Sequence, residues 1–523
     1  MRIGVDDCTD ERSVLRIICD QPYAIVDRRG NILFEGQARQ ALLCSIREAE
    51  AGRRVWYFIL KTFAPEEKNA AEAMAREVRS RIKRSVTVGR DPRVDVTPPA
   101  IGDLSAPEPR LAVYLGPYFS RAAAGVDEAR AYGASSETKF YRSYLVANPG
   151  TIEMRDATGS VVAKSTDGYL GMKPMAENSL VYGRRLRSDY RTWADGQRWN
   201  TDENRAYRGW MEVWANPEGR LSAVNRVFLE HYLYGVVAPE IGTSVPFEMQ
   251  KTQAVIARSE AIAKLRMHRY AGWHYDHCDT QMSQVYKGVY SEEPATNAAV
   301  DATWGQVVVY ENEIADAVYC MSCGGLTANN EDVWGGKPKG YLRSVLDGPG
   351  NGPAPKLDDW RKVENWLKQR PMLYCHPEQE GFPAYSRKSN FRWSGAYNAD
   401  GLARRMREVY GDVGRVTNVR VVERTPSGRV RELAFDTTGR GAVHFRGEMP
   451  VRRALRLRST FFVLDREFDG EGNITWCRIQ GAGWGHAVGL CQSGATVMAA
   501  KGFHYLDILQ HYFKGIEVYR IYR

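Results

Sequence analysis

Hydrophobic residues near the start of the chain come in short runs that are separated by turn residues. Apolar runs begin at Val14 and at Tyr23, and a third run, which begins at Ile32, follows the pair Gly30-Asn31. Apolar runs joined by a turn of this kind are typical of a β-hairpin. Residues 1–52 are therefore predicted to be a short β-rich segment.

A different pattern begins at Val55, where aromatic-rich apolar runs alternate with Ala-rich stretches. The apolar runs predict strands at residues 55–63, 86–88, 111–119 and 141–146. The Ala-rich stretches after the first and third strands predict two helices. The resulting order, βαββαβ, is that of a ferredoxin-like module, which we assign to residues 53–147.

The pattern changes twice more along the chain. Residues 148–225 are polar, with Gly, Asp and Arg clusters, and are predicted to be a β-rich segment that leads into the next domain. From residue 226 onward apolar periodicity is denser, with a helix predicted at residues 246–264. Strands are predicted beyond it, among them one at residues 315–320 and a hairpin of residues 416–422 with 430–435. Residues 226–523 are thus expected to form a larger β-rich α+β domain, and the whole chain a mixed, multi-domain α+β protein.

Composition bounds the class of protein. The 523 residues are too many for one ordinary core, and 43% hydrophobic with 26% charged content is normal for folded soluble domains. The formal net charge of +9 favours a polyanionic partner, such as nucleic acid, an anionic membrane surface or an anionic wall polymer. A solvated surface with a slight excess of arginine is the alternative. No nucleic-acid motif is recognised, so no nucleic-acid partner is expected.

Membrane and redox signals are weak. No apolar stretch is long enough to span a membrane, and the residues after Met1 lack the pattern of a signal peptide, so no transmembrane segment is expected. The nine cysteines are an odd count at low density, which is unlike a disulfide-dense scaffold. One or two disulfide bridges are compatible with that count.

Glu240 is the first candidate for chemistry. It ends an apolar run and follows Pro239 directly, so its carboxyl group is expected to be partly desolvated. Desolvation disfavours the charged form and raises the pKa of a carboxyl group, as a general acid requires. Judged on residue type alone, a helix-capping or surface glutamate is the alternative, because most glutamates are solvated.

A glycine-rich stretch carries the second candidate. Glycines at positions 481, 483, 485 and 489 surround His486 and precede Gln492. Glycine lets the backbone approach a ligand closely or adopt positive φ, and a Trp and a His in such a loop suit sugar recognition. A tight turn with a satisfied histidine is the alternative. The stretch is not a phosphate loop, because no Lys-Ser or Lys-Thr follows the glycines.

The third candidate is a pair of cysteines with C-x-x-C spacing, Cys320 and Cys323. Such a pair is found as half of a zinc site, as a redox pair, or by coincidence. Cys278 and Cys375, each beside a histidine, are the residues that would complete a metal site. The spacing differs from that of a standard zinc finger.

Taken together, these stretches resemble the SpoIID/LytB family, which comprises stage II sporulation protein D and its relatives. The resemblance covers about residues 215–520, and the similar pieces occur in the order that the family has. The pieces begin at Tyr232 (Tyr-Leu-Tyr-Gly-Val-Val-Ala-Pro-Glu), Gln253 (Gln-Ala-Val-Ile-Ala-Arg-Ser-Glu-Ala), Cys278 (Cys-Asp-Thr), Gln284 (Gln-Val-Tyr-Lys-Gly), Ser322 (Ser-Cys-Gly-Gly-Leu-Thr), Glu331 (Glu-Asp-Val-Trp), Tyr341 (Tyr-Leu-Arg-Ser-Val), Arg453 (Arg-Ala-Leu-Arg-Leu-Arg-Ser-Thr-Phe-Phe) and Gly483 (Gly-Trp-Gly-His-Ala-Val-Gly-Leu-Cys-Gln-Ser-Gly-Ala).

The resemblance implies a lytic transglycosylase of the bacterial cell wall. Such enzymes cut peptidoglycan glycan strands between N-acetylmuramic acid and N-acetylglucosamine, prefer strands without stem peptides, and leave a 1,6-anhydro end. The family's acid glutamate falls on Glu240. Residues expected to bind substrate beside it are Arg258, Tyr286, Ser322, Trp334, His486 and Gln492. The resemblance also implies a periplasmic or wall-facing location and a cell-wall amidase as a partner.

One departure from the family concerns metal. Family members with zinc carry His and Cys shortly after the first Cys of the Cys-Asp-Thr segment, where this chain has Gln281, Met282 and Ser283. No cofactor and no tightly bound zinc are therefore expected. A zinc site built differently, from Cys320, Cys323 and Cys375, is the alternative.

The segment 53–147 resembles a SPOR domain, a module that binds peptide-free glycan. The resemblance rests on two short motifs, which begin at Tyr57 and Val113, each followed by an Ala-rich helix. Any other ferredoxin-like module is the alternative, because that fold hosts many functions. For the whole chain, the rivals to an enzyme are a non-catalytic wall-binding protein of the same fold and an amidase enhancer.

Overall fold

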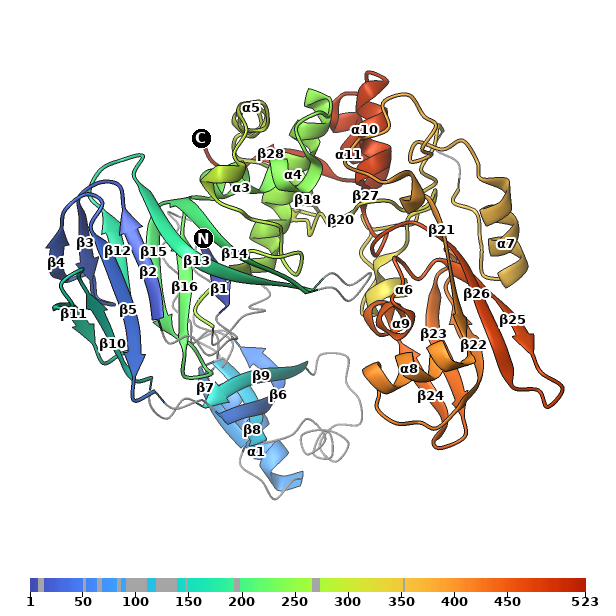
Figure 1. The fold of residues 1–523 in the computed structure, drawn as a ribbon, viewed down its shortest axis with the longest axis horizontal. Coiled ribbons are helices and arrows are strands. Elements are labelled where there is room, and N and C mark those ends of the chain that lie inside the picture. The colour runs from blue at the N-terminus through green and yellow to red at the C-terminus, as the bar shows by residue number, and fades with distance from the viewer. Residues whose placement is uncertain are drawn as a thin grey trace. The chain divides into compact units, whose positions relative to one another are not determined.

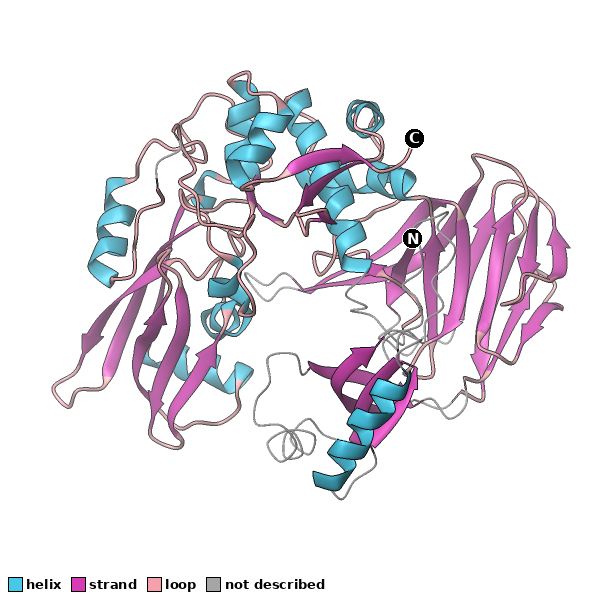
Figure 2. Ribbon diagram, turned by 180° about the vertical axis from the view of Figure 1, so that it is seen from behind, coloured by secondary structure: helices cyan, strands magenta, loops and turns pink. Residues whose placement is uncertain are grey.

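The structure is a computed structural model of the chain that divides into two compact units. It describes residues 1–7, 14–49, 53–63, 68–81, 86–90, 111–118, 139–145, 149–191, 198–265, 273–350 and 353–523. Unit 1 comprises Met1–Asp189, Asn200–Gly235 and Ala261–Ser291, and unit 2 comprises Tyr190–Trp199, Val236–Glu260 and Glu292–Arg523. Unit 1 is built mostly of strands, whereas most of the helices belong to unit 2 (Figures 1 and 2).

Two large sheets form the bulk of unit 1. The seven-stranded sheet has the order β17 (His277–Cys278), β1 (Arg2–Asp7), β16 (Leu221–Arg226), β15 (Trp210–Ala215), β12 (Tyr169–Pro174), β3 (Tyr23–Val26) and β4 (Ile32–Gly36). The six-stranded sheet has the order β11 (Val161–Ser165), β10 (Thr151–Arg155), β5 (Ala41–Arg47), β2 (Val14–Cys19), β13 (Leu180–Arg191) and β14 (Arg198–Arg208). Segments 1–52 and 148–225 therefore supply strands to the same sheets.

Alternating side chains explain the sheets of unit 1. On β2, Leu15, Ile17 and Cys19 are buried, whereas the residues between them are more exposed. This period of two is expected of a strand that buries one face. The predicted N-terminal hairpin is confirmed as the antiparallel pair β3–β4, and Gly30 takes a φ of 90° in its turn.

A smaller sheet lies within residues 53–147. Its antiparallel strands have the order β7 (Val86–Arg90), β8 (Leu111–Tyr118), β6 (Arg53–Phe63) and β9 (Lys139–Leu145), and helix α1 (Lys68–Arg81) follows β6 in the chain. The four strands and the first helix correspond to predicted elements. The second predicted helix, which begins at Ser120, falls outside the described residues. The complete βαββαβ module thus stays a prediction.

Unit 2 mixes helices with small sheets. Its helices are α5 (Pro294–Ala302), α6 (Asn330–Trp334), α7 (Trp360–Gln369), α8 (Ala399–Val409), α9 (Glu448–Leu455), α10 (Gln492–Ala500) and α11 (Tyr505–Tyr512). Two helices, α3 (Leu229–Ile241) and α4 (Phe247–Leu265), have residues in both units. Three-residue 3₁₀ turns are η2 (Val289–Ser291) in unit 1 and η3 (Lys388–Asn390) in unit 2.

The sheets of unit 2 are short. They are β19 (Glu313–Ile314) with β18 (Gln306–Tyr310) and β28 (Glu517–Arg520); β20 (Tyr319–Cys320) with β27 (Leu490–Cys491); β21 (Arg392–Asn398) with β26 (Ile474–Ala482) and β25 (Phe462–Phe468); and β22 (Val416–Arg424) with β23 (Val430–Thr437) and β24 (Gly441–Arg446). The hairpin predicted near residues 416–435 is confirmed as β22–β23. The strand expected from residue 315 is shorter than predicted, because only Tyr319–Cys320 pairs.

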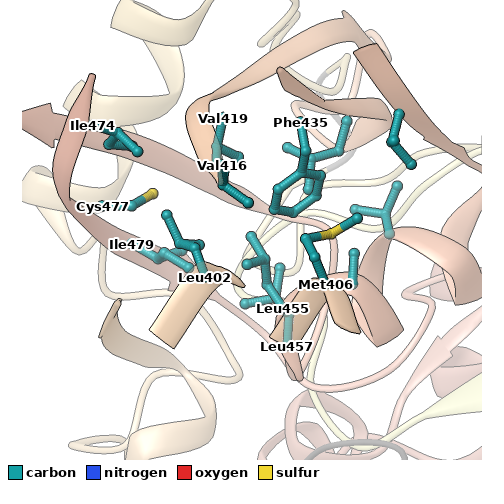
Figure 3. Packing of buried hydrophobic residues seen from close by; sticks show 14 of the residues in the cluster. Leu402, Met406, Val416, Val419, Phe435, Leu455, Leu457, Ile474, Cys477 and Ile479 are labelled. Carbon is teal, nitrogen blue, oxygen red and sulfur yellow. The ribbon is translucent and has the colours of Figure 1, made fainter. Parts of the chain in front are cut away.

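The largest described hydrophobic cluster of unit 2 joins β22, β23 and β26 to α8 and α9 (Figure 3). We call it the apolar core. Leu402 and Met406, four residues apart, bury one face of α8, and Cys477 and Ile479 alternate inward on β26. The helical spacing on α8 and the alternation on β26 thus bring apolar side chains of distant segments into one packed interior.

Together the units confirm the predicted class of a mixed, multi-domain α+β protein. Among the described residues, none of the helices has both the length and the apolar character that a membrane crossing requires.

Candidate active site and cysteine cluster

Glu240 lies in the last turn of α3 and is half-buried. The helix ends at Ile241, and the next residue, Gly242, takes a φ of 70° and donates its N–H to the carbonyl of Ala238 at 2.8 Å. A glycine with positive φ is a common way to end a helix. The carbonyl end of a helix carries partial negative charge and disfavours a second negative charge beside it.

Tyr385 comes from the irregular segment after α7 and lies beside the C-terminal end of α3, since a Cβ atom added at Gly242 would lie 4.0 Å from the Cβ of Tyr385. Burial raises the pKa of its hydroxyl, and the negative charge of Glu240 contributes in the same direction. The hydroxyl shares a hydrogen bond of 3.2 Å with Thr496 Oγ1 on α10. Sequence reasoning missed Tyr385, because no periodic pattern marks the segment that carries it.

Gln492 begins α10 and is buried beside α4. Its Nε2 donates to Gln253 Oε1 at 3.3 Å, and its backbone carbonyl accepts from Thr496 Oγ1 at 2.8 Å. The Nε2 of Gln253 is itself buried without a hydrogen-bond partner among the residues that the structure describes. Tyr385, Thr496 and these two glutamines are linked by hydrogen bonds and form the polar network around α10, and they belong to unit 2, as Glu240 does.

Ser322, Trp334 and His486 come together around the glycine-rich loop. The backbones of Ser322 and Trp484 exchange hydrogen bonds of 3.2 and 2.8 Å. The ring of Trp334 lies 4.9 Å from that of His486, centroid to centroid, and 48% of Trp334 is exposed. His486 Nδ1 accepts from the N–H of Val488 at 3.0 Å. The exposed indole offers a flat apolar surface, and the substrate-binding roles of these three residues beside Glu240 stay predictions.

Arg258 and Tyr286 have surroundings of another kind. Arg258 is fully buried, and its guanidinium donates to the carbonyls of Gln306 at 3.0 Å and Val300 at 3.4 Å. Tyr286 belongs to unit 1, where its buried hydroxyl donates to Asn225 Oδ1 at 2.8 Å. Both contacts hold the fold together. The substrate-binding roles of these two residues stay predictions.

Cys278 begins the Cys-Asp-Thr segment near which zinc-containing members of the family bind their metal. Its Sγ lies 3.2 Å from Thr280 Oγ1 and 3.5 Å from Ser283 Oγ, and Nε2 of the neighbouring His277 lies 3.0 Å from the carbonyl of Ala261. Among the described residues, Cys278 belongs to no group of three or more mutually close metal ligands. The residues present do not fit a zinc ion at this place.

Four other ligand groups do converge, in unit 2. Cys323, Asp347, Cys375 and Cys491 are buried, and one potential ligand atom from each lies within 4.8 Å of the others. We call this set the cysteine cluster. Two of its members, Cys323 and Cys375, were among the four metal candidates, whereas Asp347 and Cys491 were missed. Cys320 pairs with Cys491 across the strands β20 and β27, but it is outside the set.

The charge balance of the cysteine cluster is unusual. Burial raises the pKa of Asp347 to about 8 and holds the pKa values of Cys323 and Cys375 well above their ordinary range. Burial alone would also raise the pKa of Cys491, but hydrogen bonds from Cys323 and Cys375 outweigh it and lower that pKa well below its ordinary value. The eight cysteines that the structure describes form no disulfide.

Comparison with known proteins identifies the class. Residues 217–310 match the family model described as stage II sporulation protein (SpoIID), and residues 328–489 match one described as a domain of unknown function (DUF8618). Stage II sporulation protein D of Bacillus amyloliquefaciens is 28% identical over 312 residues, which cover 57% of this chain and 75% of that protein. The protein of the same name from Bacillus subtilis (strain 168) is 28% identical over 313 residues, which cover 57% and 76%.

The comparisons therefore support the SpoIID resemblance that the motifs indicated, with a SpoIID segment at residues 217–310 and similarity to two stage II sporulation proteins D. A further relative is the amidase enhancer of Bacillus subtilis (strain 168), which is 25% identical over 301 residues. The match covers 54% of this chain but 39% of the enhancer, so only part of that protein is shared. Glu240 falls inside the SpoIID match, and the SPOR-like character of residues 53–147 stays a prediction.

Proposed function

We propose that the protein is a lytic transglycosylase that cleaves the glycan strands of peptidoglycan, with Glu240 as its acid and base. The observation that carries the proposal is the half-buried position of Glu240 at the carbonyl end of α3, within the SpoIID match. The polar side chains of Gln253 and Gln492 supply amides suited to sugar hydroxyl and N-acetyl groups. Trp334 supplies an exposed indole on which a sugar ring can stack.

The chemistry needs one carboxyl group. Protonated Glu240 gives its proton to the glycosidic oxygen, the C1–O bond breaks, and the N-acetylglucosamine end leaves with a new 4-hydroxyl group. The 6-hydroxyl of the muramic acid then attacks C1 and returns its proton to Glu240. Because the nucleophile belongs to the substrate, the step is intramolecular, requires no second carboxylate and consumes no water.

A test compares Glu240→Gln with the wild type on peptide-free glycan strands. The amide keeps the shape but cannot donate the proton, so the rate should fall by roughly a hundredfold or more. Glu364→Gln is the matched control, since Glu364 lies on α7 and pairs with Lys368 at 2.9 Å. Mass spectrometry separates anhydro ends from hydrolysed ends, which are heavier by one water. Near wild-type production of anhydro ends by Glu240→Gln would refute the assignment.

A second candidate function is a binding role, as an amidase enhancer or another non-catalytic wall protein. The similarity to an amidase enhancer favours it. In that case neither the wild type nor Glu240→Gln would yield anhydro ends, but the wild type would raise the rate of a cell-wall amidase. A wall-facing location belongs to both proposals.

Residues 53–147 are proposed to tether the protein to stripped glycan, as a SPOR-like module would. Tethering raises the local concentration of substrate without changing the chemical step. Replacing the segment with a Gly/Ser linker should therefore weaken retention on peptide-free sacculi more than it slows cleavage of short fragments. Equal retention of both proteins would leave the segment a plain structural domain.

A further inference from the structure

We propose that Cys323, Asp347, Cys375 and Cys491 bind a single Zn²⁺ ion in a closed, structural site that fixes the segments carrying Ser322 and Gln492. The site differs from the place of the family's zinc near Cys278, which lies in unit 1. It is also independent of the proposed reaction, because none of its four ligands is assigned a part in catalysis.

The spacing of the ligand atoms fits a tetrahedral zinc ion. With a Zn–S distance of about 2.3 Å, two sulfurs of a tetrahedral site lie about 3.8 Å apart. The Sγ atoms of Cys323 and Cys375 are 3.9 Å apart, and Cys323 Sγ lies 3.3 Å from Asp347 Oδ2. All four ligand atoms lie within 4.8 Å of one another, so one ion can reach all of them. These separations are longer than a disulfide bond and short enough for a shared cation.

The donor set selects the metal and its role. Three sulfurs and one carboxylate oxygen suit zinc, whereas calcium and magnesium prefer oxygen ligands. All four ligand residues are 0% exposed. Four protein ligands leave no open position for water or substrate, which is the arrangement of structural zinc sites.

Hydrogen bonds from neighbouring groups hold the ligands Asp347 and Cys491 in place. Tyr512 donates its hydroxyl to Asp347 Oδ1 at 2.5 Å, and the N–H of Cys375 donates to Asp347 Oδ2 at 3.1 Å. The N–H of Cys323 donates to the sulfur of Cys491 at 3.3 Å. Cys491 is also the N-cap of α10, where the helix dipole favours a thiolate. Such contacts orient ligands around a metal.

Two further observations point to a cation. Asp347 is completely buried and forms no ion pair within the part of the chain that the structure describes, although a buried carboxylate is costly unless a positive charge or a proton compensates it. In addition, α10 has Gly494 where a Cβ atom would lie 2.2 Å from Asp347 Oδ1. A glycine is therefore needed for the backbone of α10 to approach the carboxylate this closely.

A bound ion would connect four segments that are distant in sequence. Cys323 follows β20, Asp347 follows α6, Cys375 follows α7, and Cys491 lies at the start of α10. Closing such long loops restricts the unfolded chain, and metal binding contributes directly to folding. Since Ser322 precedes Cys323 and Gln492 follows Cys491, the ion would fix the backbone beside two expected substrate-binding residues.

The test is the metal content of the full-length protein. Wild-type protein without an affinity tag is purified under reducing conditions, and elemental analysis should give a single zinc per chain. Cobalt titration of the chelated protein should produce the charge-transfer absorption of thiolate-bound Co²⁺. Asp347→Asn, which keeps the shape, should weaken cobalt binding at least about a hundredfold, more than changes in an outer shell usually do. Cys491→Ser should abolish the thiolate bands.

Cys477→Ser is the matched control, because Cys477 is buried in the apolar core and should leave the zinc content unchanged. Wild-type protein that contains no zinc, and that shows no thiolate bands with cobalt, would overturn the proposal. So would mass spectrometry that finds Cys323 and Cys375 joined in a disulfide in the purified protein. None of these readouts depends on glycan cleavage, so failure of the zinc site and failure of the proposed function are distinguishable.

Discussion

Two buried regions of unit 2 contain cysteines, in surroundings of opposite kinds. In the apolar core, Cys477 packs among aliphatic and aromatic side chains such as Leu402 and Ile479 (Figure 3). In the cysteine cluster, three sulfurs surround the carboxylate of Asp347. The burial of the sulfurs is nearly equal, since Cys477 and Cys491 are both 0% exposed. The two sulfurs differ in the side chains that surround them.

The difference shows in the protonation of the two cysteines. Burial raises the pKa of Cys477 to about 11, so its thiol stays neutral and behaves as a small hydrophobic group. At Cys491, hydrogen bonds from two other thiols reverse the effect of burial and favour a thiolate. Burial therefore does not decide what a cysteine does. Neighbouring hydrogen-bond donors and charges set the pKa of the thiol, and so whether the sulfur is a neutral apolar group or a thiolate that can bind a metal.

Among the changes that test this comparison, removal of the metal is expected to reduce stability the most. Structural zinc contributes about 10–16 kcal/mol of apparent binding energy in zinc-finger peptides, which is comparable to the stability of a whole domain. Chelation should therefore lower the Tm of the wild type by about 10 °C or more, measured by calorimetry, and added zinc should restore it. An unchanged Tm after complete chelation would mean that the cysteine cluster is held without metal.

Shortening a side chain of the apolar core should cause the next largest loss of stability. Phe435 is fully buried and packs against Phe445, with ring centroids 5.5 Å apart. Phe435→Ala removes apolar contacts and leaves a cavity, so it should reduce the free energy of unfolding by about 3–5 kcal/mol. Denaturant titration measures the loss. The zinc content should be unchanged, and loss of zinc in this variant would show that the two regions are coupled.

A glycine substitution probes the close approach in the cysteine cluster. Gly494→Ala would bring a Cβ atom to 2.2 Å from Asp347 Oδ1 and 2.4 Å from the hydroxyl of Tyr512, so these groups must shift. Stability should fall by about 1–3 kcal/mol, as overpacking usually costs, and zinc affinity by about 10–100-fold. Gly395→Ala on β21 is the control, because nothing lies within 4 Å of its added Cβ. Equal zinc affinities in both variants would contradict the proposed geometry.

Local patterns predicted the elements of the fold better than the groups that form its polar sites. Helix α4, the hairpin β3–β4 and the hairpin β22–β23 follow from periodicity and turn residues that lie within a few positions of one another. The cysteine cluster depends instead on four segments spread from residue 323 to residue 491. No local pattern encodes such a distance, and Asp347 has no motif that distinguishes it from a surface aspartate.

The candidate site shows the same limit. Motif resemblance led to Glu240, His486 and Gln492, because each lies in a distinctive run of residues. Tyr385 belongs to an irregular segment and becomes visible only when α3, α10 and that segment are seen together. Arg258 illustrates the same limit from the other side, since its place in a motif suggested substrate contact, and only the structure shows that its guanidinium is buried and donates to a backbone carbonyl.

The smallest effect is expected at Cys477, and it gives the sharpest contrast between the two regions. Cys477→Ala removes one buried sulfur from the apolar core and should cost about 1 kcal/mol, similar to the loss of a methyl group. Cys491→Ala removes a sulfur of the same size and burial, but it also removes a ligand, so it should abolish zinc binding and destabilise unit 2 far more. Calorimetry and elemental analysis on both variants decide the matter. If the two alanine variants lose similar stability and neither changes the metal content, both sulfurs are packing groups, and the distinction drawn from their neighbours is wrong.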